Sequence, residues 1–263
     1  MSENIPLESM RRVAFLLMLA GLSGATGCGG GSASTTGPEP TSAVSAQHRA
    51  CAGSGGSLSG DVDGDGKADR VTVVSRAAPS RGCVYALLVH TGSRTRRYGL
   101  GTRNPRPGHT ASTAKVGAPS LDVLARIDRR AGLEIVADTW RGASTAFAAV
   151  FTIKSGRLVM MSGQSQPPLA PAGRAFPYSG SVTHQDGVDC ARGAGSGLIV
   201  ASAAAGFGGE HWNVARRFYR VVETGFLGPF RTQRVQIPYR NSLSTRFPEF
   251  SRRPFSSCTE ATP

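Results

Sequence analysis

Short apolar runs separated by glycine-containing turns predict that most of this chain forms β-strands. Neighbouring runs are joined by turn dipeptides such as Ser155-Gly156 and Thr224-Gly225. Beyond the N-terminus, no long apolar stretch repeats with the period of a helix. The runs occupy residues 71–74, 84–89, 135–139, 146–153, 158–161, 198–222 and 226–237. We therefore expect an all-β fold built from short strands.

The strand pattern contains a faint internal repeat. Moving residues 61–71 forward by 65 positions places them on the segment that begins at Arg126. Asp128 and Glu134 then keep the third and ninth places of the first copy, whereas Arg126 and Arg130 replace carboxylates. A guanidinium group can fill the space of a cation by pairing with the carboxylates that remain.

The repeat also predicts the organisation of the folded part. A third copy, without acidic residues, is expected to begin near Cys190, where a glycine-rich turn leads into another apolar run. We divide residues 51–245 into stacked units of about four strands each, at about 57–115, 116–175 and 176–245. Three units are too few for a closed propeller, so we expect an open propeller-like or β-sandwich-like array. Residues 246–263 are expected to form a C-terminal tail along the surface.

The first 50 residues predict export. Two basic residues, Arg11 and Arg12, precede an apolar run that is too short to span a bilayer. We interpret residues 1–27 as a signal peptide and residues 28–50 as a disordered tether. Met10 is an alternative start, because the acidic segment before it is unusual in an export signal.

A run of small residues before Cys28 resembles the lipobox of bacterial lipoproteins, in which that cysteine is lipidated. The resemblance implies a lipid at Cys28 that anchors the protein to the outer face of the cytoplasmic membrane. Ala25 stands where that family usually has leucine. The alternative is therefore cleavage by an ordinary signal peptidase, which would leave Cys28 unlipidated and the protein secreted.

The four remaining cysteines fit an oxidising compartment. Cys51, Cys83, Cys190 and Cys258 form an even set without metal-ligand spacing, and three disulfide pairings are possible. We favour Cys51 with Cys83 and Cys190 with Cys258, which would fasten both ends of the folded part to its body. Buried free thiols are the alternative.

Composition and charge add a basic surface to this picture. The chain is 40% apolar, enough for a sizeable core, and carries a formal net charge of +13 that comes almost wholly from arginine. Such a surface either keeps the protein soluble or attracts an anionic cell-envelope polymer or protein partner. The basic clusters match no nucleic-acid module, so we expect no nucleic-acid partner.

Carboxylates at alternate positions predict a calcium loop directly before the first long strand. Asp61, Asp63, Asp65 and Asp69 lie within nine residues and would repel one another without a hard cation among them. An EF-hand begins in the same way, but its twelfth place needs a bidentate Glu and an exiting helix. Here that place is Thr72, within a β-branched run. An Asp/Gly turn without an ion is the other alternative, and magnesium is disfavoured because it prefers more water ligands.

This ladder, followed by the strand at 71–74, resembles the FG-GAP or VCBS repeat of integrin-like propellers and bacterial surface proteins. The resemblance implies side-chain ligands at the four aspartates, a backbone carbonyl ligand at Lys67, and a structural role for the ion. It extends strongly over residues 57–90 and weakly over 120–162. Residues 142–145 and 181–190 are similar to small actinobacterial lipoproteins of unknown role.

No catalytic motif is recognisable in the sequence. The nearest candidates are His184 with Asp186 and Asp189, and the group Glu210-His211-Trp212. Trp140 and Trp212 could line a pocket but fit a core equally. The turn Gly193-Ala194-Gly195-Ser196-Gly197 is glycine-rich like a phosphate loop, yet it lacks the lysine and the helix of one. We therefore expect a surface binding or interaction module, with a cell-envelope hydrolase as the alternative.

Overall fold

A computed structural model describes most of the chain after residue 50. It describes Cys51 and residues 56–78, 82–103, 118–141, 144–163, 175–207, 210–223, 225–239, 241–251 and 253–259. The expected signal peptide, tether and Cys28 lie outside these residues. Within the described part, no helix has the length and apolar character needed to cross a membrane.

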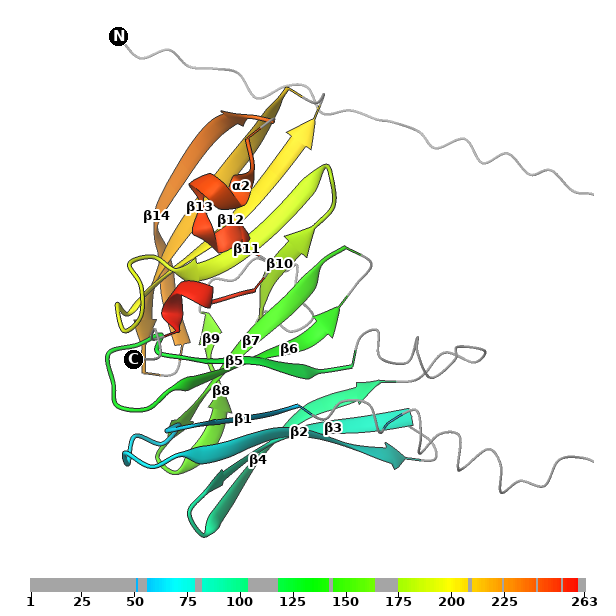
Figure 1. Cartoon of the computed structure of the whole chain (residues 1–263), viewed down its shortest axis with the longest axis vertical. Helices are drawn as coiled ribbons and strands as arrows, with labels where there is room; N and C mark the ends of the chain where they lie inside the picture. The colour runs from blue at the N-terminus through cyan, green and yellow to red at the C-terminus, as the bar shows by residue number, and fades with distance from the viewer. Residues whose placement is uncertain are drawn as a thin grey trace, which may run out of the picture. The chain divides into compact units, whose positions relative to one another are not determined.

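The first sheet is an antiparallel meander of four strands in chain order (Figure 1). Its strands are β1 (Ser57–Gly60), β2 (Asp69–Ala78), β3 (Gly82–Thr91) and β4 (Arg94–Arg103). In β2, Val71 and Val73 are buried whereas Arg70 and Val74 are exposed. This alternation gives the sheet one face that packs on the core.

The second sheet has ten strands in the order β5-β6-β7-β10-β11-β12-β13-β14-β9, with β8 also paired to β7. Its strands are β5 (Ser120–Ala125), β6 (Glu134–Arg141), β7 (Ala146–Lys154), β8 (Arg157–Met160), β9 (Ser162–Gly163), β10 (Phe176–Gly180), β11 (His184–Cys190), β12 (Leu198–Phe207), β13 (His211–Val222) and β14 (Gly225–Pro238). All neighbours are antiparallel except β9 and β14. The expected all-β fold is confirmed, and the described strands do not close into a barrel.

Three antiparallel meanders of four strands recur along the chain, at β1–β4, β5–β8 and β11–β14. Each of the expected repeat units contains one of them. In every meander a loop joins the first strand to the second, and these loops are residues 61–68, 126–133 and 191–197. Strand β10 connects the second meander to the third by pairing with both β7 and β11.

The second meander is the centre of the core because β6 and β7 are buried on both faces. Ile135, Ala137 and Phe151 pack with the first sheet. Val136 and Val150 point to the opposite face and pack with residues of β11–β14. Alternate side chains of a strand face opposite ways, so a strand covered on both sides needs the unbroken apolar runs found here.

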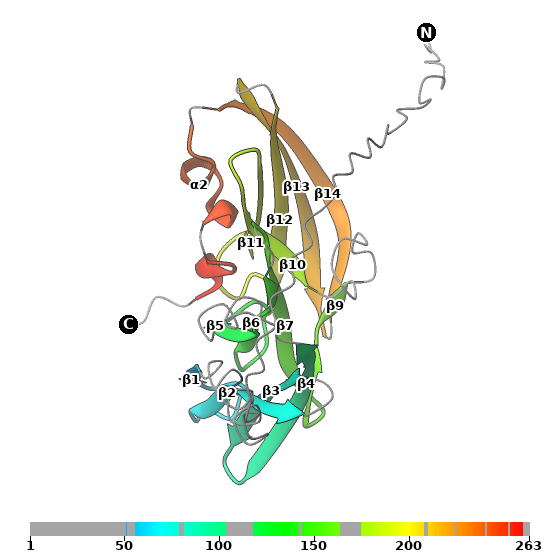
Figure 2. The ribbon, with the colours of Figure 1, turned by 90° about the vertical axis from the view of Figure 1, so that its right-hand side faces the viewer.

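The C-terminal segment supplies core side chains, which corrects the expectation of a tail along the surface. It forms α2 (Leu243–Arg246), η1 (Pro248–Phe250) and η2 (Ser256–Cys258), which lie against the second sheet (Figure 2). Phe247 and Phe250 pack with Trp212, while Phe255 is fully buried beside Phe176. The arginine, serine and proline content of the segment predicted an exposed tail, because its phenylalanines are spaced apart in the sequence and form no apolar run.

The same segment inserts one buried carboxylate into the sheet. Glu249 is 2% exposed. Its Oε1 accepts hydrogen bonds from the Ser202 hydroxyl at 2.7 Å and from Arg216 Nε at 2.6 Å. A buried charge with these partners is compensated, so η1 is fixed to β12 and β13 by polar as well as apolar contacts.

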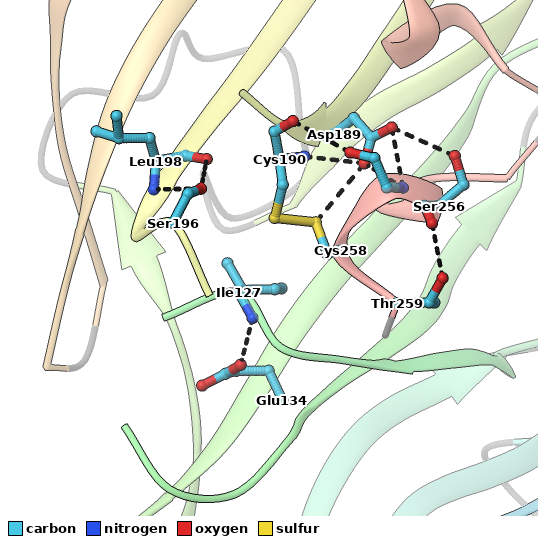
Figure 3. Close-up of a disulfide and its surroundings, with 10 residues drawn as sticks. Ile127, Glu134, Asp189, Cys190, Ser196, Leu198, Ser256, Cys258 and Thr259 are labelled. Carbon is cyan, nitrogen blue, oxygen red and sulfur yellow. Dashed lines mark hydrogen bonds between the residues drawn. A yellow bond between two sulfur atoms is a disulfide. The ribbon is translucent and has the colours of Figure 1, made fainter. Parts of the chain in front are cut away.

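The disulfide pairing favoured from the sequence is confirmed. Cys51 bonds to Cys83, 32 residues away, and Cys190 bonds to Cys258, 68 residues away. The second bond joins the end of β11 to η2 (Figure 3). Beside it, the Asp189 carboxylate accepts hydrogen bonds from the backbone N–H groups of Cys190 and Ser257, both at 2.9 Å. Both ends of the folded part are therefore tied to its body.

Candidate metal centre

The loop between β1 and β2 brings three of the predicted ligands together. One carboxylate oxygen from each of Asp61, Asp63 and Asp65 lies within 4.8 Å of the others. Asp61 shapes the turn, since its Oδ1 accepts from the N–H of Gly64 at 2.7 Å and its Oδ2 from that of Gly66 at 3.0 Å. Converging carboxylate oxygens are the ligands that Ca²⁺ prefers in proteins.

Asp63 is the member of this cluster with a buried oxygen that the described residues leave unsatisfied. Its Oδ1 is buried and has no hydrogen-bond partner among the described residues. Its Oδ2 lies 3.7 Å from Arg96 Nη2, and Arg96 Nε donates to the carbonyl of Gly156 at 2.9 Å. A buried carboxylate oxygen without a donor is costly unless a cation approaches it.

Asp69 and Lys67, the other predicted ligands, lie outside this group of three. Asp69 is buried, and its Oδ2 accepts from the backbone N–H groups of Val62 at 2.9 Å and of Asp63 at 3.2 Å. Asp69 therefore closes the loop onto the start of β2. The backbone N–H of Lys67 donates to Asp65 Oδ1 at 2.8 Å. Lys67, whose carbonyl was the expected ligand, therefore holds Asp65 through its N–H group.

The second loop repeats this closure without the acidic cluster. Glu134 Oε2 accepts from the N–H of Ile127 at 2.8 Å, as Asp69 does from Val62 (Figure 3). Arg130 occupies the place of Asp65, and its Nε lies 3.6 Å from Asp128 Oδ2. A guanidinium thus pairs with Asp128, one of the two carboxylates that the second copy keeps. Burial, with the nearby charge of Asp128, raises the pKa of Glu134 to about 7.

The three loops are stacked on one another by backbone hydrogen bonds. The N–H of Leu133 in the second loop donates to the carbonyl of Asp61 in the first at 2.8 Å. In the same way, the N–H of Gly195 in the third loop donates to the carbonyl of Arg126 at 2.6 Å, and that of Gly197 donates to Ile127 at 3.1 Å. Because of these hydrogen bonds, the conformation of the first loop affects the position of the second loop.

Replacing Gly64 by Ala is expected to destabilise the protein by more than about 2 kcal/mol, whereas Gly66→Ala should cost about 1 kcal/mol. Both glycines have positive φ, at 80° and 82°. A Cβ at Gly64 would come 2.9 Å from the backbone of Ala131 in the second loop, but one at Gly66 meets nothing within 4 Å. Urea unfolding of both variants measures the difference. Equal losses of unfolding free energy in the two variants would show that the contact between the loops does not contribute to stability.

The histidine and acidic residues considered for catalysis are not gathered at one place. His184 Nε2 lies 2.6 Å from Asp186 Oδ2 on β11. Asp189 is on the opposite face of that strand, at the disulfide. His211 begins β13, opposite Phe207.

The tryptophans and the glycine-rich turn are likewise separate features. Trp212 is buried and stacks on Tyr239 with ring centroids 4.6 Å apart. Trp140 is 38% exposed and contacts Phe147. Gly195 and Gly197 have positive φ within the third loop, which contains no carboxylate. None of these residues adds a ligand to the acidic cluster.

A polar cluster that the sequence did not predict lies at the junction of β5, β6 and β10. Asp138 Oδ2 is 2.6 Å from Arg141 Nη2, and its Oδ1 accepts from the Tyr178 hydroxyl. Asp122 Oδ2 is buried without a partner among the described residues. Burial, and then the charge of Asp138, raises the pKa of Asp122 to about 6. The detectable signal was an aspartate inside the apolar strand Leu121–Leu124.

Replacing Asp122 by Asn is expected to flatten the pH dependence of stability between about pH 4 and 6. The folded protein binds this proton more tightly than the unfolded chain, because the pKa is raised from 3.8 to about 6. Wild-type stability should therefore fall as pH rises through this window. Asp122 is only half-buried, so solvent screening should limit the effect to about 1 kcal/mol. Urea unfolding at both ends of the window measures it, and parallel pH profiles would contradict it.

Comparison of the chain with protein-family models, with curated proteins and with solved structures found no match.

Proposed function

We propose that this chain is an exported, lipid-anchored cell-surface protein whose β-rich body acts as a binding or interaction module stabilised by one calcium ion. The observation that carries the calcium part of the proposal is that oxygens of Asp61, Asp63 and Asp65 lie within 4.8 Å of one another, with a buried oxygen of Asp63 unpartnered among the described residues. Export and the anchor rest on the pattern of the first 28 residues. The resemblance of the 61–74 segment to FG-GAP or VCBS repeats supports the same role.

The ion has a structural role in this proposal. The loop is held by its own backbone through Asp61 and Asp69, and its first carbonyl accepts a hydrogen bond from the second loop. A cation at the cluster would remove the repulsion among the three carboxylates and fix the contact between the first two meanders. The net charge of +13 favours an anionic partner at the cell envelope.

Isothermal titration of residues 50–263 with calcium tests the ion. We expect one ion per chain, with a Kd of about 10⁻⁴ to 10⁻³ M, the range of extracellular calcium modules. Absence of heat, together with an unchanged melting curve, would remove calcium from the proposal. The anchor is tested separately by fatty-acid labelling of the full chain, since Cys28→Ala should abolish labelling and release the protein into the medium.

A further inference from the structure

A second charged feature lies where the second loop meets the third. The turn 191–197, β13 and the middle of the second loop line an open cavity of about 370 Å³. This volume is at the small end of the range of about 300 to 1,000 Å³ for ligand pockets. The charged and polar residues that line the cavity are Asp128, Arg129, Arg130, Ser196 and Arg220.

Three guanidinium groups and one carboxylate give this cavity a formal excess of two positive charges. Arg130 is partly satisfied, since its Nε lies 3.6 Å from Asp128 Oδ2 and its Nη1 donates to the carbonyl of Glu223 at 3.2 Å. Arg129 and Arg220 are exposed, and no acidic residue in the described part of the chain pairs with either. The cavity therefore has two guanidinium groups that pair with no carboxylate of the described residues, and Arg220 also lies 5.9 Å from the centre of the Phe230 ring.

The internal repeat accounts for one of the three arginines. Arg130 stands where the first copy has Asp65, so the second loop keeps the closure of the first but places an arginine at this cavity. The third loop adds Ser196, with glycines at positive φ on both sides. Their positive φ angles form the tight turn that places Gly197 beside the side chain of Arg129 and Gly195 beside that of Arg126.

We propose that this cavity binds a phosphate group carried by the partner. A phosphate monoester has a charge of about −1.5 to −2 at neutral pH, which matches the formal excess of the cavity. Its three terminal oxygens can accept from several guanidinium groups at once, whereas a carboxylate offers two oxygens and a single negative charge. This inference rests on the proposed function in that it names the chemistry of the anionic partner, but it does not need the calcium site.

Isothermal titration calorimetry of residues 50–263 with sodium phosphate, in calcium-free buffer, tests the proposal. Sodium acetate and sodium chloride at equal ionic strength are the reference salts. We expect phosphate to bind and the reference salts not to. Arg220→Gln and Arg129→Gln should each weaken phosphate binding by about tenfold or more. The matched control is Arg97→Gln, which removes the same charge from an exposed position on β4 and should change nothing.

Equal binding of acetate and phosphate, or equal loss in the Arg97 control, would overturn the proposal in favour of non-specific charge attraction. Melting curves in chloride show whether each variant folds, and two exposed arginines are tested so that one misfolded variant does not decide the matter. Glycerol phosphate and vesicles with and without phosphatidic acid then distinguish a soluble ester from a lipid headgroup. Calcium binding with no phosphate binding would refute this inference and leave the calcium proposal standing.

Discussion

Calcium at about 10 mM is expected to raise the melting temperature of the wild-type protein by about 3 to 10 °C, and Asp63→Ala should abolish this gain. An ion that binds the folded state with a Kd of about 10⁻⁴ to 10⁻³ M contributes about 1.4 to 2.7 kcal/mol at that concentration. Asp63 is decisive because its Oδ1 is buried and without a described partner, so a bound cation would supply its missing interaction.

The same substitution should have little effect in calcium-free buffer. Removing the carboxylate relieves repulsion from Asp61 and Asp65. It also releases Arg96, which keeps its hydrogen bonds to the Gly156 carbonyl and the Thr91 hydroxyl. We expect the melting temperatures of wild type and Asp63→Ala to agree within about 4 °C without calcium, since the net change should be about 1 kcal/mol or less.

Two control variants separate the role of the ion from that of the loop. Glu210→Gln removes the same charge at an exposed position and should keep the full response to calcium. Asp69→Ala should destabilise the protein even without calcium, because Asp69 Oδ2 accepts two backbone hydrogen bonds that close the loop. If Asp63→Ala gained as much stability from calcium as wild type, the acidic cluster would not be the binding site.

Features with a local cause could be predicted from the sequence. Turn dipeptides and β-branched runs predicted the strands, because strand and turn preferences act within a few residues. The acidic ladder predicted the cluster of Asp61, Asp63 and Asp65, since alternate positions in a tight turn converge. The placement of Asp69 was less predictable, because the same carboxylate can bind an ion or close the loop.

Features that depend on distant segments could not be predicted in this way. Nothing in the strand at 146–154 says that one face meets the first sheet and the other meets β11–β14, because that depends on how the meanders stack. The cluster of Asp122, Asp138 and Tyr178 is assembled from three strands whose pairing was unknown. Glu249 gave no signal either, since its partners are Arg216 and Ser202, more than 30 residues away in sequence.

Replacing Cys190 and Cys258 together by Ala is expected to cost about 4 kcal/mol and to lower the melting temperature by about 8 to 16 °C. The bond closes a segment of 68 residues, so its loss returns considerable entropy to the unfolded chain. The Cys51→Ala/Cys83→Ala double variant is the matched control. Its bond spans 32 residues, and the entropic loss should be slightly smaller.

The two double variants should differ more in where the structure loosens than in total stability. Cys258 holds η2 against β11, where Phe255 N–H donates to the Val188 carbonyl at 3.0 Å and Ser257 N–H to Asp189. Without that bond, amide hydrogen exchange should rise in residues 253–259, including the N–H groups of Phe255 and Ser257, whereas the control should loosen β2 and β3. Unchanged exchange around η2 would mean that Phe255 and Asp189 alone hold the C-terminal segment in place.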